Sequence, residues 1–173
     1  MTDSAPTNLH VEPGAGRSAL IGGMFGVIAK ISADLTRSRV AIVEHTLAPK
    51  QLGAPPHKHS REDEFSFVLE GQLTVEQLGK TVTVGPGGYV AKPRDIMHAF
   101  WNAGAEPVRF VEIIAPGDFA TYFYELDELF KSGQVSPDNP GAILALAARY
   151  GMEMDFGRIP ELVQKHDLQI GTS

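Results

Sequence analysis

Cysteine is absent from this chain of 173 residues, so disulfide bonds and thiolate metal sites are excluded. Positive charge is also scarce, because 15 Lys and Arg residues stand against 21 Asp and Glu residues, for a net charge of -6. This acidity disfavours nucleic acid and anionic membranes as partners. The apolar stretch at residues 19–29 is interrupted by glycine and is too short to span a bilayer. It does not follow the pattern of a signal peptide, so we expect a cytoplasmic protein without a membrane partner.

Length and composition favour one globular domain with a buried core. Hydrophobic residues make up 43% and charged residues 21% of the chain, which is close to the average for globular proteins. Residues 1–17 are rich in Pro, Gly, Thr and Asp and carry no periodicity, so we expect a flexible N-terminal arm there. We assign residues 18–116 to a β-barrel and residues 117–173 to a helical extension packed on it.

Short runs rich in β-branched residues, separated by turn signals, fill the middle of the chain. Residues 24–31 and 40–47 are predicted as strands, and the segment 48–56, which contains Pro and Gly, as a loop. Gly79-Lys80 is predicted as a two-residue hairpin loop with Gly first. Short strands at close spacing favour a sandwich or barrel over alternating strands and helices. Further strands are expected at residues 65–69, 73–78, 81–84, 89–92, 98–102 and 108–115.

After Pro116 the apolar residues fall at helical spacing. The first helix is expected between a cap at Asp118 and an end at Gly133. Further helices are predicted over residues 139–151 and 160–170. None of these segments has a basic face, so a DNA-binding helix-turn-helix is not expected. The first helix carries an apolar stripe that packs against the barrel or a dimer partner: Phe119, Tyr122, Phe123, Leu126, Leu129 and Phe130.

Two clusters of side chains that commonly bind metals lie in the predicted β region. His57 and His59 are two residues apart, so on a strand both imidazoles point to one face. Glu64 stands at an odd offset from His59 and joins the histidines only if the chain turns or bulges at residues 60–61. His98 must come from another strand, brought close by closure of the barrel. Imidazole nitrogen with carboxylate oxygen suits one divalent transition metal, Mn, Fe, Co, Ni, Cu or Zn, rather than Ca or Mg.

The spacing of these residues resembles the two sequence motifs of the cupin superfamily. The first motif is matched by His57, His59, Glu64 and Gly71, and the second by Gly87, Pro93, His98 and Asn102. Asp95 stands where the family usually has Gly, and Asp tolerates the left-handed backbone of a tight turn better than most residues. The resemblance covers residues 40–115 and implies a mainly β fold, a double-stranded β-helix or jelly-roll barrel. It also implies the metal ligands, which are His57, His59, Glu64 and His98.

The whole chain is similar to small bacterial cupins described as similar to quercetin 2,3-dioxygenase, which add C-terminal α-helices to the barrel. This resemblance implies a metal-dependent dioxygenase acting on a small aromatic or enolisable substrate. For such a reaction we expect Glu64 to act as the catalytic base. Because one fold hosts many activities, two alternatives stay open. One is a non-redox metal-dependent isomerase, lyase or hydrolase, and the other is a non-catalytic cupin that binds a small molecule. We also expect a homodimer.

Other side chains allow both a structural and a functional interpretation. Glu62 and Asp63 are interpreted as a solvated charge run, with Glu62 as an alternative second acid near the metal. His45 is predicted as a packed core histidine. A buried Glu112 needs a partner, for which Arg109 and His45 are the candidates. Tyr89, Phe100 and Trp101 are predicted to lie in the core. Tyr89 or Phe100 could instead line a cavity.

Overall fold

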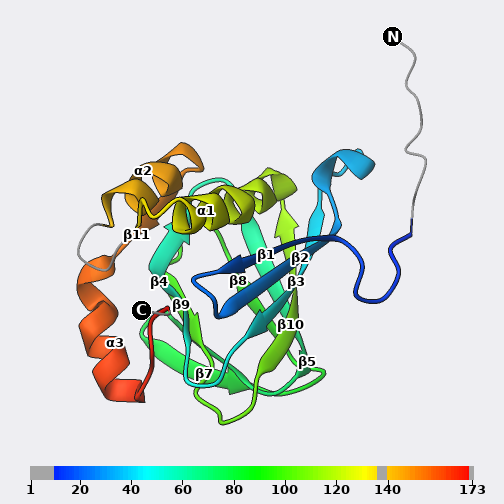
Figure 1. Cartoon of the computed structure of the whole chain (residues 1–173). Coiled ribbons are helices and arrows are strands. Elements are labelled where there is room, and N and C mark those ends of the chain that lie inside the picture. The colour runs from blue at the N-terminus through cyan, green and yellow to red at the C-terminus, as the bar shows by residue number, and fades with distance from the viewer. Residues whose placement is uncertain (1–9, 136–139, 172–173) are drawn as a thin grey trace, which may run out of the picture.

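Two antiparallel β-sheets face each other and form a barrel in the computed structural model, which describes residues 10–135 and 140–171 (Figure 1). One sheet has the strand order β1 (Arg17–Ile21), β2 (Phe25–Ile31), β3 (Ala41–Leu47), β10 (Val108–Ala115), β5 (Asp63–Glu70) and β8 (Tyr89–Lys92). The other has the order β11 (Met152–Met154), β4 (Leu52–His59), β9 (His98–Trp101), β6 (Leu73–Gln77) and β7 (Lys80–Val84). The predicted mainly β jelly-roll barrel with C-terminal α-helices is confirmed.

Alternate residues of the strands fill the barrel interior, because successive side chains of a strand point to opposite faces. On β10 every second residue from Val108 to Ile114 is buried, and on β3 every second residue from Ala41 to Leu47. Most of these side chains are apolar. Among the buried residues of these two strands, only His45 and Glu112 are polar.

Strand β4 begins at Leu52, so the predicted loop at residues 48–56 is wrong over its second half. Ala54 pairs with a residue of β9, and the register shifts both before and after it. Pro55 and Pro56 follow within the strand. Proline has no N–H for the ladder and is tolerated in sheets mainly at such irregular positions. The loop prediction treated the two prolines as turn residues and overlooked an irregular strand.

Two further strands were not expected from the sequence pattern. β1 starts at Arg17, the last residue of the predicted arm, and forms a hairpin with β2. β11 has three residues and pairs with β4, with Met154 opposite His57. A strand this short leaves no periodicity to detect. The division of the chain into arm, barrel and helical extension stays a prediction, and β11 joins the extension to one barrel sheet.

The hairpin between β6 and β7 turns one residue earlier than predicted. Its loop residues are Leu78 and Gly79, and Lys80 already belongs to β7. The two loop residues have φ values of 52° and 69°, and positive φ at both positions is typical of a type I′ hairpin turn. The prediction therefore placed Gly79 in the loop correctly but at the wrong position within it.

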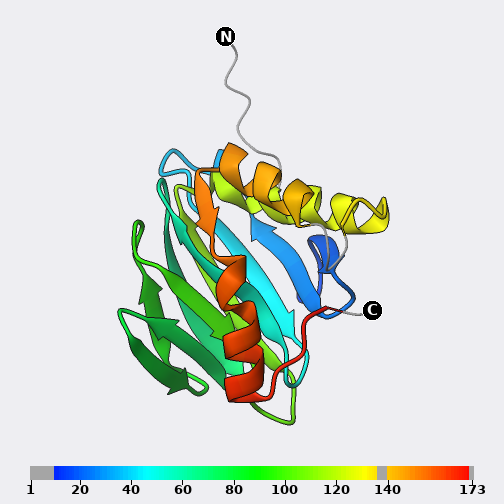
Figure 2. The same ribbon diagram turned by 90° about the vertical axis from the view of Figure 1, so that its left-hand side faces the viewer.

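Helices cover one end of the barrel and the outer side of one sheet (Figure 2). The 3-10 turn η2 (Gly117–Ala120) leads into α1 (Thr121–Lys131), which lies beside α2 (Gly141–Arg149) across the barrel end. The turn η3 (Phe156–Arg158) leads into α3 (Ile159–His166), and Leu162 of α3 packs in a cluster with Leu52 and Trp101. A short turn η1 (Ala33–Leu35) joins β2 to β3. Within the described ranges, no helix is long and apolar enough to cross a membrane.

The apolar stripe of the first helix packs into the main core, as predicted for contact with the barrel. The predicted cap at Asp118 is wrong, because this residue lies inside η2 and its carboxylate pairs with Arg39. The predicted end at Gly133 is confirmed: its φ is 70° and its N–H donates to the carbonyl of Phe130 at 3.1 Å. Asn139, the predicted start of the second helix, lies outside the described residues.

Candidate metal centre

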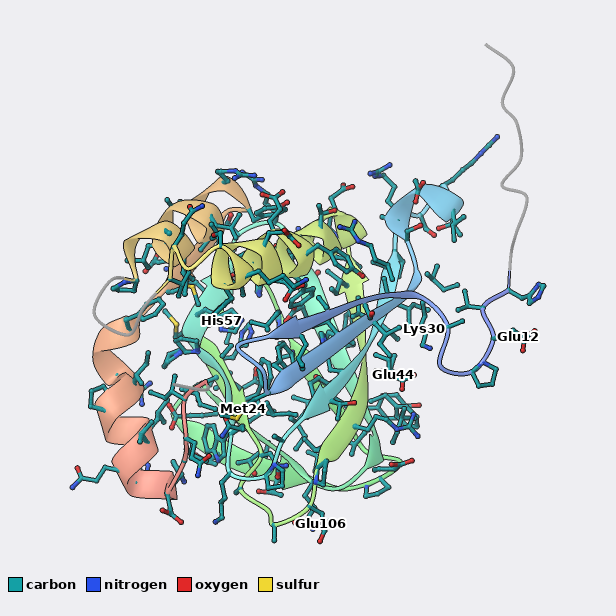
Figure 3. All side chains as sticks on the ribbon, in the orientation of Figure 1. Glu12, Met24, Lys30, Glu44, His57 and Glu106 are labelled. Carbon is teal, nitrogen blue, oxygen red and sulfur yellow. The ribbon has the colours of Figure 1, made fainter. Side chains whose placement is uncertain are left out.

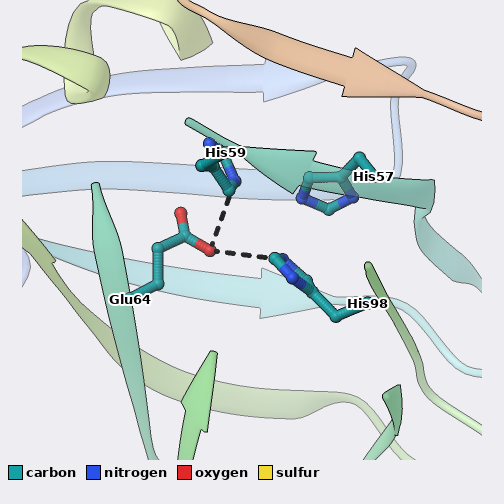
Figure 4. A group of neighbouring side chains, drawn as sticks. All are labelled: His57, His59, Glu64 and His98. Atoms are coloured by element: carbon teal, nitrogen blue, oxygen red, sulfur yellow. Dashed lines mark ion pairs between the residues drawn. The ribbon is translucent and has the colours of Figure 1, made fainter. Parts of the chain in front are cut away.

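Three strands bring four side chains together inside the barrel (Figure 4). β4 supplies His57 and His59, and the neighbouring strand β9 supplies His98, which pairs with His57 in the ladder. Glu64 comes from β5 in the facing sheet. None of the four residues is more than 4% exposed. The convergence expected from the sequence is therefore present, and it lies in the interior.

A tight turn between β4 and β5 brings Glu64 to the same side as the histidines, as its odd offset required. β4 ends at His59 and β5 begins at Asp63. The carboxylate of Asp63 accepts hydrogen bonds from Nη2 of Arg94 at 2.6 Å and from the Arg94 backbone N–H at 2.9 Å. The backbone N–H of Asp95, whose φ is 62°, donates to the carbonyl of His59 at 2.7 Å. These contacts hold the segment before His98 against the turn.

The four side chains offer atoms close enough to share one ion. Each contributes one ligand atom, and these atoms all lie within 4.8 Å of one another. Oε2 of Glu64 is 3.7 Å from Nε2 of His59 and 3.7 Å from Nε2 of His98. Three imidazoles and one carboxylate are a donor set suited to a divalent transition metal. The cluster could therefore hold such an ion.

Each imidazole is oriented through its Nδ1 atom. Nδ1 of His57 and Nδ1 of His98 each donate to the backbone carbonyl two residues earlier, at 2.8 and 3.0 Å. Nδ1 of His59 donates to Oε1 of Glu62 at 3.1 Å. Because these oxygens can only accept, the Nε2 atoms carry lone pairs. Nε2 of His59 and Nε2 of His98 are buried and have no hydrogen-bond partner in the described part of the chain. A metal ion would satisfy both, so these residues fit one.

The protonation states of the cluster also suit a cation. Burial lowers the pKa of His57 well below its ordinary value, and the nearby His98 and His59 lower it further. Burial lowers the pKa of His98 as well. For Glu64, burial raises the pKa, but the charge of Lys92 and the nearby rings of His59 and His98 outweigh this effect and hold it well below its ordinary value. Neutral imidazoles, as at His57 and His98, and an ionised carboxylate, as at Glu64, are the forms that bind metals.

Glu62 belongs to this site, so its interpretation as a solvated charge is wrong. The residue is only 3% exposed, and its contact with Nδ1 of His59 is a buried hydrogen bond. A carboxylate behind a ligating imidazole fixes the ring orientation and raises its basicity. This contact agrees with the alternative suggested by the strand parity that Glu62 shares with Glu64.

A buried ion pair lies next to Glu64. Nζ of Lys92 is 3.1 Å from Oε2 of Glu64 and 2.7 Å from Oε2 of Glu112. Oγ of Ser66 donates to the same Oε2 of Glu112 at 2.9 Å. Lys92 is only 1% exposed, so its charge is balanced inside the barrel rather than by water.

The sequence interpretation missed Lys92 and assigned Glu112 the wrong partners, since neither Arg109 nor His45 forms its hydrogen bonds. Arg109 instead pairs with glutamates outside the barrel interior. A signal for Lys92 was present, because it shares strand parity with Val90 on β8 and both are buried. This parity was not used, because lysine side chains are ordinarily exposed.

An apolar cavity of about 1130 Å³ adjoins the cluster. His57, Glu64 and Lys92 are among its polar lining residues. The labelled Met24 and His57 (Figure 3) both line it, so the β1–β2 turn and β4 form parts of its wall. A mostly apolar cavity with a few convergent polar groups is the usual form of a small-molecule site. The aromatic part of the wall includes Phe25, Phe100, Phe119, Tyr122 and Phe123.

The three predicted core aromatic residues have three different positions. Phe100 is buried and also lines the cavity, with Nζ of Lys92 at 5.0 Å from its ring centroid. Trp101 is buried in the smaller cluster beneath α3. Tyr89 is 70% exposed, so its core prediction is wrong. Its neighbour Val90 occupies the inward position of β8 instead.

His45 is confirmed as a packed core histidine, with its ring stacked on Phe25 at a centroid distance of 4.7 Å. Burial, followed by the charge of Lys92, lowers its pKa to about 3. The unfolded chain titrates this group near pH ~6.5 and so binds a proton that the folded chain excludes. His45 therefore contributes stability above pH ~6.5 that is lost as the pH falls toward 3.

We expect this contribution to appear in urea denaturation of the metal-free protein. Lowering the pH from 7 to 5 should reduce the free energy of unfolding by about 2 kcal/mol more in the wild type than in His45→Phe. Phenylalanine keeps an aromatic ring beside Phe25 and removes the titrating group. The same pH dependence in both proteins would show that His45 does not titrate abnormally.

The chain is similar to a known protein family and to proteins of known name. Residues 43–114 match the family model described as Cupin domain. The quercetin 2,3-dioxygenase of Bacillus subtilis (strain 168) is 24% identical over 160 residues, which cover 92% of this chain and 43% of that protein. The rhicadhesin receptor of Pisum sativum is 31% identical over 110 residues, which cover 61% of this chain and 50% of that protein. The chain thus spans half or less of the length of these relatives.

A solved structure shares the barrel. The polyketide cyclase RemF from Streptomyces resistomycificus superposes with a TM-score of 0.55 at 24% sequence identity, over 64% of this chain and 80% of that one. At this identity the likeness shows the fold alone.

Proposed function

Because this chain belongs to the cupin superfamily, we propose that it is a metal-dependent cupin enzyme, a dioxygenase acting on a small aromatic or enolisable substrate. The observation that carries the proposal is the set of imidazole Nε2 atoms gathered beside the carboxylate of Glu64 at the wall of an apolar cavity. Similarity to a quercetin 2,3-dioxygenase along 92% of the chain supports it. In such a reaction both atoms of O2 enter the substrate, so no separate reductant is required.

We assign His57, His59, Glu64 and His98 as the ligands of one divalent transition metal, Mn, Fe, Co, Ni, Cu or Zn. A bound redox-active ion of this group would stabilise negative charge on a substrate oxygen and exchange electrons with O2. The unpartnered, buried Nε2 atoms and the hydrogen-bonded Nδ1 atoms support this assignment.

Glu64 is the proposed catalytic base. It lines the cavity, and the nearby charge of Lys92 helps to keep its carboxylate ionised before a substrate arrives. The carboxylate then accepts the hydroxyl proton of an enolisable or phenolic substrate. Lys92 stays hydrogen-bonded to Glu112 and holds one oxygen of Glu64 in place.

The cavity wall supports an aromatic substrate. Phe119 meets the ring of His59 edge-on at a centroid distance of 4.5 Å and stacks on Tyr122 at 4.9 Å. These rings offer flat apolar contacts next to the cluster. They also limit the access of water to the reacting atoms.

Oxygen uptake tests the proposal. Protein loaded separately with Fe, Mn or Ni is offered a panel of flavonols and β-diketones, and we expect at least one combination to consume O2 together with the substrate. Glu64→Gln should lower kcat by at least about 100-fold, because it removes the base and weakens a ligand. Glu153→Gln, at an exposed position of the edge strand β11, is the matched control and should change kcat little. No uptake with any metal, or full activity in Glu64→Gln, would contradict the proposal.

A non-redox metal-dependent isomerase, lyase or hydrolase is the second candidate, favoured by the proton-carrying groups behind Glu64. Burial raises the pKa of Glu112 to about 7, against the opposing effect of Lys92, so this group can exchange a proton near neutral pH. Activity that survives replacement of the metal by zinc and the exclusion of air would select this candidate. Stoichiometric ligand binding without any turnover would select a non-catalytic binding cupin.

The proposal includes a homodimer that acts on a small-molecule substrate in the cytoplasm. Apolar side chains exposed on the barrel support self-association, because exposed apolar surface favours protein contacts. They include Phe65 at 40%, Val82 at 44% and Tyr89 at 70% exposure.

A further inference from the structure

Three buried polar atoms of cavity-lining residues have no hydrogen-bond partner among residues 10–135 and 140–171: Oδ1 of Asp127 on α1, and Nδ1 of His45 and Oε1 of Glu112 on two paired strands. His45 and Glu112 are each only 2% exposed. In the ladder between β3 and β10, His45 pairs with Phe110 and Val43 pairs with Glu112. His45 and Glu112 are therefore diagonal neighbours on the inward face, with Cα atoms about 7–8 Å apart.

The remaining hydrogen-bonding capacity of Glu112 is already used. Its Oε2 accepts from Oγ of Ser66 at 2.9 Å and from Nζ of Lys92 at 2.7 Å. When Glu112 is ionised, its Oε1 is left as an acceptor in the interior. Buried polar atoms without partners are rare in folded proteins, so this one requires a specific explanation.

His45 complements that acceptor. Burial and the charge of Lys92 keep its ring neutral, against smaller opposing contributions from Glu64 and the backbone of Gly26. A neutral imidazole carries one N–H and one lone pair. With the imidazole proton on Nδ1, a hydroxyl group can donate to Oε1 and at the same time accept from Nδ1–H. A carbonyl cannot donate to the carboxylate, and an ammonium cannot accept from the imidazole.

Aromatic rings pack around His45. Phe25 stacks on His45 with an interplanar angle of 21°, and Phe110 and Phe123 lie with centroids 5.1 Å from its ring. The ring centroids of Phe100 and Phe25 are 5.9 Å apart. Such walls favour a planar aromatic ligand.

We propose that His45 and Glu112 form a second polar subsite of the cavity, which binds a hydroxyl group on an aromatic ligand. The subsite lies across Lys92 from Glu64. The inference rests on the proposed function, in which another oxygen of the same ligand lies at the metal centre. It narrows the substrate class to aromatic compounds with at least two oxygen substituents, one for each site.

Two naphthols that differ by one hydroxyl test the subsite. 2-Naphthol and 2,7-dihydroxynaphthalene are titrated into the metal-loaded protein under nitrogen, and their fluorescence gives both dissociation constants without turnover. The wild type should bind the diol about tenfold more tightly, as expected for one additional well-placed hydroxyl. Equal affinities would overturn the subsite.

Variants of His45 decide whether the preference arises there. His45→Phe keeps an aromatic ring but removes Nδ1, so the preference should fall below about threefold. His45→Asn can place an amide near the position of Nδ1 and should keep more of the preference. Glu112→Met should also abolish it, but this change takes a partner from Lys92 and can unfold the chain, so the two His45 variants are decisive. An unchanged preference in His45→Phe would overturn the inference.

Failure of the subsite and failure of the dioxygenase are distinguishable. A diol preference that depends on His45, without O2 uptake for any substrate, supports the subsite and contradicts the dioxygenase. Oxygen uptake with equal affinities for the two naphthols supports the dioxygenase and contradicts the subsite.

Discussion

His98→Ala, purified without a chelator, should contain less than about a tenth of a metal ion per chain, against about one in the wild type. His98 provides the imidazole from β9, and its Nε2 lies 3.7 Å from Oε2 of Glu64. Alanine removes this donor and leaves space that water can enter. Two imidazoles and one carboxylate then hold the ion more weakly, so it is lost during purification. Elemental analysis by mass spectrometry measures the content directly.

The matched control is His10→Ala. The His10 side chain is 78% exposed and lies outside the cluster, so this variant should keep its metal. Full metal content in His98→Ala would contradict the assigned ligand set. Equal loss in both variants would show that histidine content, rather than the site, determines binding.

Lys92→Met should lower the free energy of unfolding by about 3–5 kcal/mol, the cost of leaving buried charge without its partner. Nζ of Lys92 contacts the carboxylates of both Glu64 and Glu112. Methionine fills similar space without charge, so both carboxylates lose their cation in a site that water reaches poorly. Urea denaturation of the metal-free protein measures the change.

Two further variants separate the ion pair from general effects. Lys80→Met, at an exposed position of β7, should change stability by less than about 0.5 kcal/mol. Adding Glu112→Gln to Lys92→Met should recover part of the loss, because one of the unpaired carboxylates is removed. A cost below about 1 kcal/mol for Lys92→Met would show that the pair contributes little to folding.

Much of the candidate site could be predicted from the sequence, because the offsets between nearby residues indicate which side chains point to the same face of a strand. The i, i+2 offset of His57 and His59 places both on one face of a strand, and the odd offset of Glu64 requires the turn that the structure has. Asp95 lies in a left-handed turn, as the resemblance to the family motif indicated. His98 needed the motif resemblance, because its pairing with β4 is a long-range contact.

The features that were missed depend on partners far away in the sequence. Glu62 and Lys92 carry charges that ordinarily remain in solvent, and only the folded barrel brings each a buried partner. β11 exists because the edge of β4 is available for pairing, not because its three residues have a strong strand pattern. Pro55 and Pro56 lie in a strand because shifts in the ladder tolerate their missing N–H groups.

Anomalous X-ray diffraction from cobalt-loaded crystals, recorded above and below the cobalt absorption edge, tests the central claim most directly. We expect one strong peak in the barrel, bonded to Nε2 of His57, His59 and His98 and to a carboxylate oxygen of Glu64. Metal-replete crystals with no peak among these four side chains, or with their only peak elsewhere, would contradict it.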